Sequence, residues 1–563
     1  MFFWKKRAAK GAHIDGNNPY STGEEAHPDA PNATPSERVD VVTPQAVQSE
    51  LQTFIASHEQ RRKQLPRAAV VGVMAGLLGS AFRICLNWIG NQRTLLVLSL
   101  HHLGLWAIIF PVLLGIFGSA IAVALVEKVA PETAGSGIPH LKAVLHHLRG
   151  MRWERIIPVK FIGGITGIGG GLALGREGPT IQMGAACGKM LSEFLGANPR
   201  ERQTLIAAGA GAGLAAAFNA PLAGMVFVLE EVQRDFTPIV FGASLIASVM
   251  SDVVTRFLTG QDPVFHLRGF PIPPLTALPA FLVVGVLAGF LGVAYNRGLL
   301  YSLDLFRLIR KWPPGAGGAL VGVLVGLTTW FLPRASGGGY QLLDDVFKGN
   351  MIFEALIGFF LLRFVLTMLS YGCGAPGGIF APLLILGALL GVFVGRGTHW
   401  AFPGMAYYPV AFAIVGMGAY FSAIVRAPLT GIVLMLEMTG SYQQMLPLLI
   451  ACFTAYAVAD MMGDHPIYEA LMERDLLRGQ HVPELKETLL LDLTIQAHSP
   501  FEGKPVRELG LPHGCILVSI HRGIEEIVPT ADTIIYSADR VTAIISPQAP
   551  EAVEVLRKGA GLD

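Results

Sequence analysis

The sequence contains few charged residues and no framework of paired cysteines. Only 15% of its 563 residues are charged, whereas a soluble globular chain carries roughly 25%. Its five cysteines have neither metal-ligand spacing nor a disulfide pattern: Cys85, Cys187, Cys373, Cys452 and Cys515. The net charge of +1 gives no electrostatic footprint for nucleic acid. These absences argue against a disulfide-rich secreted domain and against a nucleic-acid-binding protein.

Targeting and catalytic signals are also missing. Polar residues, not an apolar h-region, follow the basic N-terminus, so we expect no cleavable signal peptide. His58-Glu59 is followed by Arg62 where a zinc protease would carry a second histidine. Neither a Gly-x-Ser-x-Gly elbow nor a phosphate-binding glycine loop ending in Lys-Ser/Thr is present. The protein is therefore not expected to be an enzyme.

Apolar residues and glycine are abundant. The chain is 52% hydrophobic and has 66 glycines, which is typical of a polytopic helical membrane protein. Runs long enough, or nearly so, to cross a membrane cover 68–90, 105–126, 277–300, 316–332, 352–370, 379–396, 408–425 and 445–462. Runs that are too short, or are broken by Gly, Pro or Glu, cover 134–146, 156–175, 177–195, 204–217 and 220–231. Because broken helices at membrane depth must be buried in protein or line a watery cavity, the pattern predicts a transport core.

One segment recurs in the second half of the chain. APLAGMVFVLE, which begins at Ala220, returns as APLTGIVLMLE from Ala427, an offset of 207 residues. Gly178-Pro179 likewise matches Ala381-Pro382, which places Glu177 opposite Phe380. A duplicated membrane chain holds its small solute between the halves, near mid-membrane. The residues alone do not decide between parallel and inverted repeats.

Composition divides the chain into three parts. Residues 1–60 are polar and expected to be largely disordered and cytoplasmic. Residues 61–476 form the membrane domain, and 487–547 contain strand-like runs that predict a small cytoplasmic α/β domain. The basic residues just before the first apolar run favour a cytoplasmic N-terminus. We expect a multi-pass protein of the cell's inner (plasma) membrane, with no metal or organic cofactor in the membrane domain.

Three glycine–proline motifs stand at the starts of the broken helices: Gly135-Ser136-Gly137-Ile138-Pro139, Gly175-Arg176-Glu177-Gly178-Pro179 and Gly378-Ile379-Phe380-Ala381-Pro382. Proline suits the first helical turn, and glycine lets the backbone approach a ligand. A helix N-terminus offers free N–H donors and about half a positive charge, which favours an anion. Three converging N-termini would bind a small anion without lysine or arginine. The alternative is that these pairs merely separate helices.

Three acids lie at the ends of broken helices. Glu177 begins a helix, where its ionised carboxylate would occupy the place of a free anion and its protonated form would leave, coupling protons to anions. The alternative is a capping glutamate on a surface helix. Glu230 has a repeat mate in Glu437 and could be structural, whereas Glu231 has Met438 opposite it and is the better proton-relay candidate. The alternative for Glu231 is a solvated charge at a helix end.

The residues from about 67 to 475 resemble the CLC family of chloride channels and chloride/proton antiporters. The resemblance rests on GSGIP (135–139), GREGP (175–179), GLAAAFNAPLAG (213–224), GGIFAP (377–382), RAPLTG (426–431) and HPIYEAL (465–471). It implies an all-α polytopic fold of tilted and broken helices in two inverted repeats, assembled as a homodimer with a pathway in each subunit.

The resemblance also assigns roles. The Ser136 and Tyr468 hydroxyls and the N–H groups of Ile379 and Phe380 would bind chloride. Glu177 would be the outward-facing gating acid. Glu231 would be the inner proton-transfer acid, which favours proton-coupled antiport over a passive proton-gated channel.

Two positions depart from some bacterial exchangers of the family. His140 and Lys142 stand where those relatives carry acids. Lys142 could pair with Glu231 and weaken inner proton delivery. The alternative is that both are solvated at a cytoplasmic helix end.

The tail resembles the C-terminal regulatory domain of potassium-channel regulators, of the TrkA-C or RCK-C type. The resemblance lies in residues 503–509, 515–518, 527–529, 532–533 and 539–541. It implies dimeric sensing of a ligand, possibly of nucleotide type. A membrane-anchored sensor with vestigial transport is therefore a further alternative to the antiporter.

Overall fold

The computed structural model of the protein describes residues 44–261, 263–265, 273–309, 312–348, 351–402, 408–478, 489–523, 525–546, 548–549 and 551–562. Of the expected disordered segment 1–60, residues 1–43 lie outside this description.

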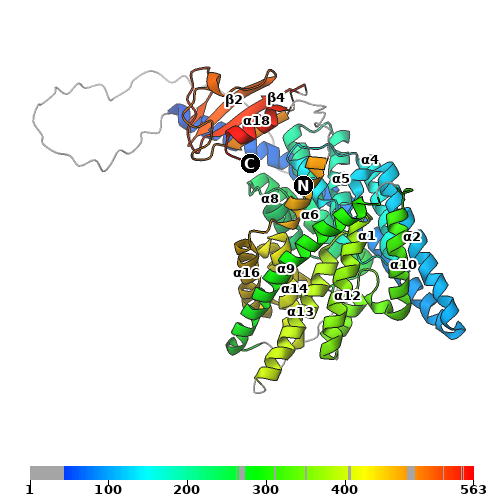
Figure 1. Cartoon of the computed structure of the whole chain (residues 1–563). Helices are drawn as coiled ribbons and strands as arrows, with labels where there is room; N and C mark the ends of the chain where they lie inside the picture. The colour runs from blue at the N-terminus through cyan, green and yellow to red at the C-terminus, as the bar shows by residue number, and fades with distance from the viewer. Residues whose placement is uncertain are drawn as a thin grey trace, which may run out of the picture. The chain divides into compact units, whose positions relative to one another are not determined.

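Helices build the membrane domain in the order of the apolar runs (Figure 1). Their bounds are α1 Pro44–Leu100, α2 Ile109–Val129, α3 Ile138–Leu145, α4 Trp153–Gly169, α5 Glu177–Phe194, α6 Pro199–Phe218, α7 Pro221–Phe227, α8 Pro238–Thr259, α9 Leu278–Arg307, α10 Ala316–Phe331, α11 Tyr340–Phe347, α12 Phe353–Gly372, α13 Phe380–Ala401, α14 Pro409–Val425, α15 Pro428–Thr439, α16 Met445–Met461 and α17 Ile467–Arg478. Among the described residues, 7 helical segments are long and apolar enough to cross a membrane. Six of the eight long runs predicted to span the membrane fall largely within these segments, and the runs 316–332 and 408–425 form the shorter apolar helices α10 and α14. The mostly helical membrane domain confirms the predicted fold class.

Helix α8 is a span-length helix that the apolar runs did not predict. Polar residues interrupt its sequence, and several are buried among neighbouring helices: Ser244, Ser248, Ser251, Asp252 and Thr255. Two of them bond other helices: Ser251 Oγ donates to Ala212 O at 2.7 Å, and Thr255 Oγ1 accepts from Ser80 Oγ at 3.1 Å. An apolar-run criterion fails here because these polar groups face protein instead of lipid.

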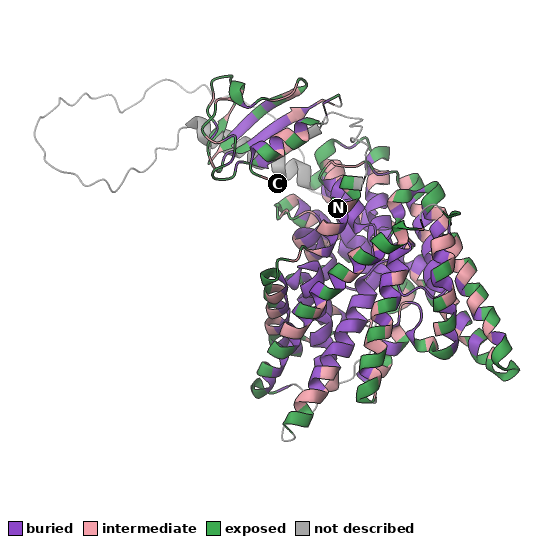
Figure 2. Cartoon of the chain, in the orientation of Figure 1, coloured by how far each residue is buried: buried purple, intermediate pink, exposed green. Residues whose placement is uncertain are grey.

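The two halves repeat the same close helix packing. In α5, a Cβ added at Gly184 would lie 2.2 Å from Gly209 O of α6. In α13, a Cβ added at Gly387 would lie 2.4 Å from Gly416 O of α14. These contacts leave no room for a side chain, so Gly184 and Gly387, which stand at matching positions of the two halves, fix matched helix pairs. Both pairs are buried almost throughout, and Figure 2 shows the buried residues concentrated along the central helices.

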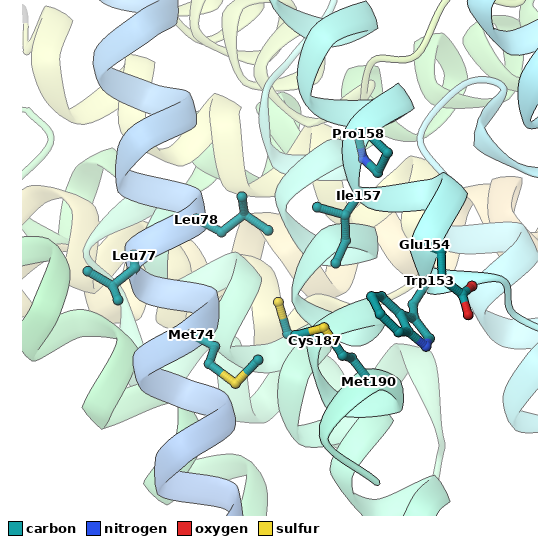
Figure 3. A pocket seen from close by; sticks show the side chains of 9 residues that line it. All are labelled: Met74, Leu77, Leu78, Trp153, Glu154, Ile157, Pro158, Cys187 and Met190. Carbon is teal, nitrogen blue, oxygen red and sulfur yellow. The ribbon is translucent and has the colours of Figure 1, made fainter. Parts of the chain in front are cut away.

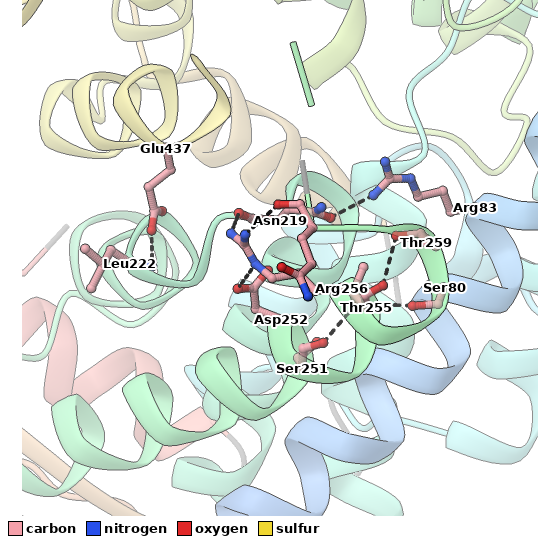
Figure 4. Close-up of polar contacts among 11 residues, drawn as sticks. Ser80, Arg83, Asn219, Leu222, Ser251, Asp252, Thr255, Arg256, Thr259 and Glu437 are labelled. Atoms are coloured by element: carbon pink, nitrogen blue, oxygen red, sulfur yellow. Dashed lines mark hydrogen bonds and ion pairs between the residues drawn. The ribbon is translucent and has the colours of Figure 1, made fainter. Parts of the chain in front are cut away.

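Glu230 and Glu437 reveal how the two halves are related. Glu230 lies in a π-turn, η4 (Val228–Val232), that continues α7, and it accepts from the Leu429 and Thr430 N–H groups at 3.0 and 2.6 Å. Glu437, near the end of α15, accepts from the Leu222 and Ala223 N–H groups at 3.0 and 2.7 Å (Figure 4). Each helix therefore caps the start of its repeat mate, and the two run antiparallel. The repeats are inverted, and Glu230 is a structural acid.

The tail forms its own small α/β fold. Its strands are β1 Leu489–Thr494, β2 Cys515–Arg522, β3 Glu525–Ile527 and β4 Arg540–Ile545, in an antiparallel sheet of order β1-β4-β2-β3. Helix α18, Glu551–Gly559, follows the expected range 487–547 and buries Ala552 and Leu556 in the same core.

Candidate functional site

The three glycine–proline motifs meet at one place. Gly175 N donates to Gly378 O and Gly378 N donates to Gly175 O, both at 2.7 Å. Gly377 N donates to Gly135 O at 3.0 Å. The starts of α3, α5 and α13 are thereby held together by backbone hydrogen bonds, although they come from distant parts of the sequence.

Gly178 shows how close this approach is. A Cβ at Gly178 would lie 2.8 Å from Ser136 Cα and 2.9 Å from Gly378 Cα, so one glycine touches both other motifs. Gly137 has a φ of +79°, a left-handed conformation that suits glycine. The prolines at 139, 179 and 382 all lie within the first turns of their helices, as the motifs predict.

The predicted chloride ligands surround this meeting point. Ser136 and Tyr468 are fully buried, and the Tyr468 ring stacks on Phe380 with centroids 6.4 Å apart. Ser136 Oγ accepts from Ile138 N at 3.3 Å. The Tyr468 hydroxyl has no hydrogen-bond partner among the described residues. Because a buried hydroxyl ordinarily has a hydrogen-bond partner, the unpartnered Tyr468 hydroxyl is consistent with a polar ligand at this place.

Backbone donors complete the arrangement. Ile379 precedes α13 and Phe380 begins it, where no earlier turn accepts their N–H groups. The N-termini of α3 and α5 add further partial positive charge. What the sequence did not predict is Lys160 of α4, which is fully buried and donates to Gly135 O at 2.6 Å. The Lys160 amino group therefore lies one carbonyl group away from the three motifs.

Glu177 is fully buried as the first residue of α5, so the alternative of a surface capping residue is wrong. Its Oε1 accepts a hydrogen bond from the Tyr340 hydroxyl at 2.5 Å. The Arg176 guanidinium lies over the Tyr340 ring, 4.9 Å from its centroid, and donates to Ala217 O at 3.1 Å. Sequence reasoning missed Tyr340; the available signal was the glycine run 337–339 at the start of a short helix.

Glu231 is also fully buried, which rules out the solvated alternative. It lies in η4, one residue after the structural acid Glu230, and pairs with Lys142 of α3 at 2.8 Å. Lys142 has 2% of its side chain exposed, so the predicted pairing is present and its solvated alternative is wrong.

A second acid and a second cation extend this pair. Glu469 of α17 lies 3.7 Å from Lys142 Nζ and also pairs with Arg234. The Glu469 side chain is 30% exposed and that of Arg234 is 50% exposed. The four residues form a charged path that leads from buried Glu231 toward solvent.

His140 belongs to a separate buried group. Its Nε2 contacts Gly150 O at 3.2 Å, and its Nδ1 contacts Gln182 Nε2 at 3.3 Å. The solvated alternative is wrong for His140 as well, because only 6% of the residue is exposed.

A lateral cavity of about 590 Å³ lies among α1, α4 and α5 (Figure 3). Apart from Glu154, its lining is mainly apolar: Met74, Leu77, Leu78, Trp153, Ile157, Pro158, Cys187 and Met190. None of the predicted site residues lines it, and it lacks converging donors for an anion.

Comparisons with known proteins identify relatives of both the membrane domain and the tail. A family described as voltage gated chloride channel matches residues 118–460, and the TrkA-C domain matches 490–556. The H(+)/Cl(−) exchange transporter ClcA of Vibrio parahaemolyticus is 42% identical over 431 residues, covering 74% of this chain and 91% of the relative. The ClcA protein of Salmonella arizonae is 42% identical over 421 residues, covering 73% and 88%.

Solved structures with a similar fold were also found. A slow cyanobacterial Cl−/H+ antiporter matches with a TM-score of 0.71 and 38% identity, over 74% of this chain and 99% of that chain. A CLC-type fluoride/proton antiporter matches with a TM-score of 0.60 and 24% identity, over 71% and 95%.

Proposed function

The chain belongs to the voltage-gated chloride channel (CLC) family, and on this basis we propose that it exchanges chloride for protons across the membrane. Exchange is favoured over a passive channel because ClcA of Vibrio parahaemolyticus and the slow cyanobacterial antiporter, both similar to this chain over 74% of its length, are exchangers. The buried inner acid Glu231 supports the same choice. The observation that carries the proposal is the position of Glu177, a buried carboxylate where three helix N-termini meet.

Chloride would bind to donor groups at or beside the helix starts that meet here. The Ser136 and Tyr468 hydroxyls and the N–H groups of Ile379 and Phe380 donate to it, and no side-chain cation touches it. Because partial charges attract the ion less than a full charge does, chloride can also leave. Lys160 would help to fix the loop before α3 through its hydrogen bond to Gly135 O.

Glu177 would compete with chloride for these donors. Ionised, its carboxylate is a tethered anion beside the N-terminus of α5. Protonated, it is no longer attracted by the helix dipole and swings away, so chloride can take its place. Each proton that binds Glu177 from the outer side would therefore allow a chloride to take the place of the carboxylate. Because the carboxylate and the chloride cannot occupy this place together, the exchange would be obligatory.

Glu231 would deliver protons from the inner side. The charged path of Lys142, Glu469 and Arg234 connects it to solvent. Since the buried acid must lose its ion pair with Lys142 when it is protonated, we propose that this step slows the exchange.

The experiment is a reversal potential in reconstituted vesicles under a pH gradient. An exchanger's reversal potential shifts with the pH gradient, whereas a channel's follows chloride alone. Glu231→Gln should reduce proton movement while chloride still moves. A reversal potential that ignores the pH gradient in the unmodified protein would refute exchange.

We also propose a homodimer in the inner (plasma) membrane with cytoplasmic termini. Val249, Val253 and Phe257 recur every four residues and expose an apolar face on α8, which suits contact with lipid or a second copy. The basic residues before the first span support the orientation. Subunit counting in membranes by single-molecule photobleaching tests the dimer.

For the tail, we propose a regulatory role through a small ligand of nucleotide type. Support comes from the TrkA-C match over residues 490–556. Deleting residues 480–563 should leave exchange intact if the tail only modulates it. Loss of all transport would instead favour the sensor alternative.

A further inference from the structure

We propose that Tyr340 is a positioning residue for the gate: its hydroxyl holds ionised Glu177 in place, so that this hydrogen bond sets how acidic the medium must be before the gate opens. The proposal rests on the proposed exchange function. It concerns a residue outside the three glycine–proline motifs.

The contact itself is short and sheltered. Tyr340 Oη donates to Glu177 Oε1 at 2.5 Å, and Glu177 is fully buried. A hydroxyl donates to an ionised carboxylate more strongly than to a protonated one, because hydrogen bonds to charged groups are the stronger kind. The contact therefore favours the closed, ionised gate over the open, protonated one.

The loop 335–339 places the Tyr340 ring there. Gly337 and Gly339 have φ values of +62° and +77°, which bring the chain sharply into α11. A Cβ at Gly339 would lie 2.5 Å from Ile385 Cδ1 and 3.1 Å from Arg363 Cζ. The loop thus fits its surroundings only with glycine at this position.

Arg363 of α12 fixes this loop. It is fully buried and donates to Ala335 O and Gly337 O, both at 2.8 Å. On the other side, Gly337 N donates to Gly171 O at 2.8 Å, in the connection between α4 and α5. A buried arginine used only to hold carbonyl groups shows that the position of Tyr340 is structurally specified.

Arg176 holds the ring from the opposite side. Its guanidinium lies 4.9 Å from the ring centroid, an attractive cation–π distance. Arg176 precedes Glu177 in sequence, so gate and tyrosine are clamped to the same helix start. When Glu177 leaves on protonation, Tyr340 stays behind, ready to receive the carboxylate again.

The test is the pH dependence of chloride efflux from vesicles with equal pH on both sides. Tyr340→Phe keeps the ring over Arg176 and removes only the donor. Its activation midpoint should move to higher pH by about one unit, because the ionised gate has lost a charge-assisted hydrogen bond. At neutral pH its efflux should exceed that of the unmodified protein several-fold.

Two controls separate this role from a structural one. Tyr301→Phe removes an exposed hydroxyl on α9 and should leave the midpoint unchanged. In a Glu177→Gln background, Tyr340→Phe should change the efflux rate by less than twofold, because the carboxylate that it holds is absent.

The outcomes separate the two proposals. If Tyr340→Phe transports with an unshifted midpoint, or loses rate equally at every pH, the positioning role is overturned while exchange stands. If the unmodified protein moves chloride with no dependence on the pH gradient, exchange is refuted and the positioning role with it.

Discussion

The outer and inner acids are equally buried but are held by opposite kinds of partner. Glu177 accepts from a neutral hydroxyl, whereas Glu231 is paired with the ammonium group of Lys142. Protonating the outer acid weakens one hydrogen bond. Protonating Glu231 removes its ion pair with buried Lys142, whose second carboxylate partner, Glu469, is 3.7 Å away. We therefore expect protonation to disrupt more of the surroundings of Glu231 than of Glu177.

The largest expected effect comes from removing the titratable group of the outer acid. Glu177→Gln mimics the protonated gate, so chloride should move while coupled proton movement falls below detection. Chloride-driven proton uptake into vesicles measures this directly. The matched control is Glu230→Gln, a change in an acid that caps α15. Retained proton uptake in Glu177→Gln would mean that the outer acid is not the gate.

Replacing the cation of the inner pair should give the next largest effect. Lys142→Met removes the charge that favours ionised Glu231, so proton-coupled exchange should become several-fold faster. Lys142→Arg retains the charge and should stay near the original rate. Glu469→Gln should make exchange slower. Of the two carboxylates that lie close to Lys142 among the described residues, only Glu231 would then remain. Exchange slowed by Lys142→Met would contradict the inner-relay account.

Glu230 precedes Glu231 in the sequence and allows a structural acid to be compared with a proposed functional one. Glu230→Ala removes the acceptor for three donor groups at the start of α15 and should lower stability by about 1–3 kcal/mol. Glu437→Ala should do the same at the start of α7. Thermal unfolding in detergent measures the loss, and proton coupling per chloride should be unchanged. A change in coupling without loss of stability would count against the capping role.

The last effect concerns the ion pair between Arg522 and buried Asp539 in the tail. Burial alone would raise the pKa of Asp539, but hydrogen bonds from Arg522 at 2.7 and 2.9 Å and from Tyr536 N hold that pKa below its ordinary value. Its contribution to stability is therefore present above the ordinary aspartate pKa and is lost as pH falls through the lowered one. Arg522→Gln should destabilise the tail by about 1–3 kcal/mol at neutral pH and by less in acid.

Hydrogen exchange of the β4 amides in the full chain measures this change. Arg522→Lys keeps the charge but loses the two-point contact with Asp539. Its β4 protection should therefore lie between that of the unmodified protein and that of Arg522→Gln. Equal protection of β4 at neutral pH in Arg522→Gln would show that the pair does not stabilise the tail.

Much of the site could be predicted because its chemistry is carried by short motifs. Glycine and proline at 135–139, 175–179 and 378–382 specify helix starts locally, and three such starts, two of them at matched repeat positions, indicate a common purpose. The repeat also separated Glu230 from Glu231, since only the first has an acid as its mate. The structure agrees: one acid caps a helix and the other is buried in an ion pair.

The rest could not be predicted because it depends on contacts across the fold. Tyr340 lies 163 residues from Glu177 along the chain, and only the left-handed glycines of loop 335–339 bring its hydroxyl to the gate. Arg363 was an overlooked signal, a lone cation inside the apolar run 352–370. The burial of Lys142 depends on α3, η4 and α17 packing together, which local pattern does not reveal.

The central claim is that chloride and the Glu177 carboxylate compete for the same helix N-termini. The most direct measurement is anomalous scattering from bromide in crystals of the unmodified protein and of Glu177→Gln. The account predicts a bromide at the position of the carboxylate in Glu177→Gln and none there in the unmodified protein. Identical bromide positions in the two crystals, with none where the carboxylate lies, would contradict it.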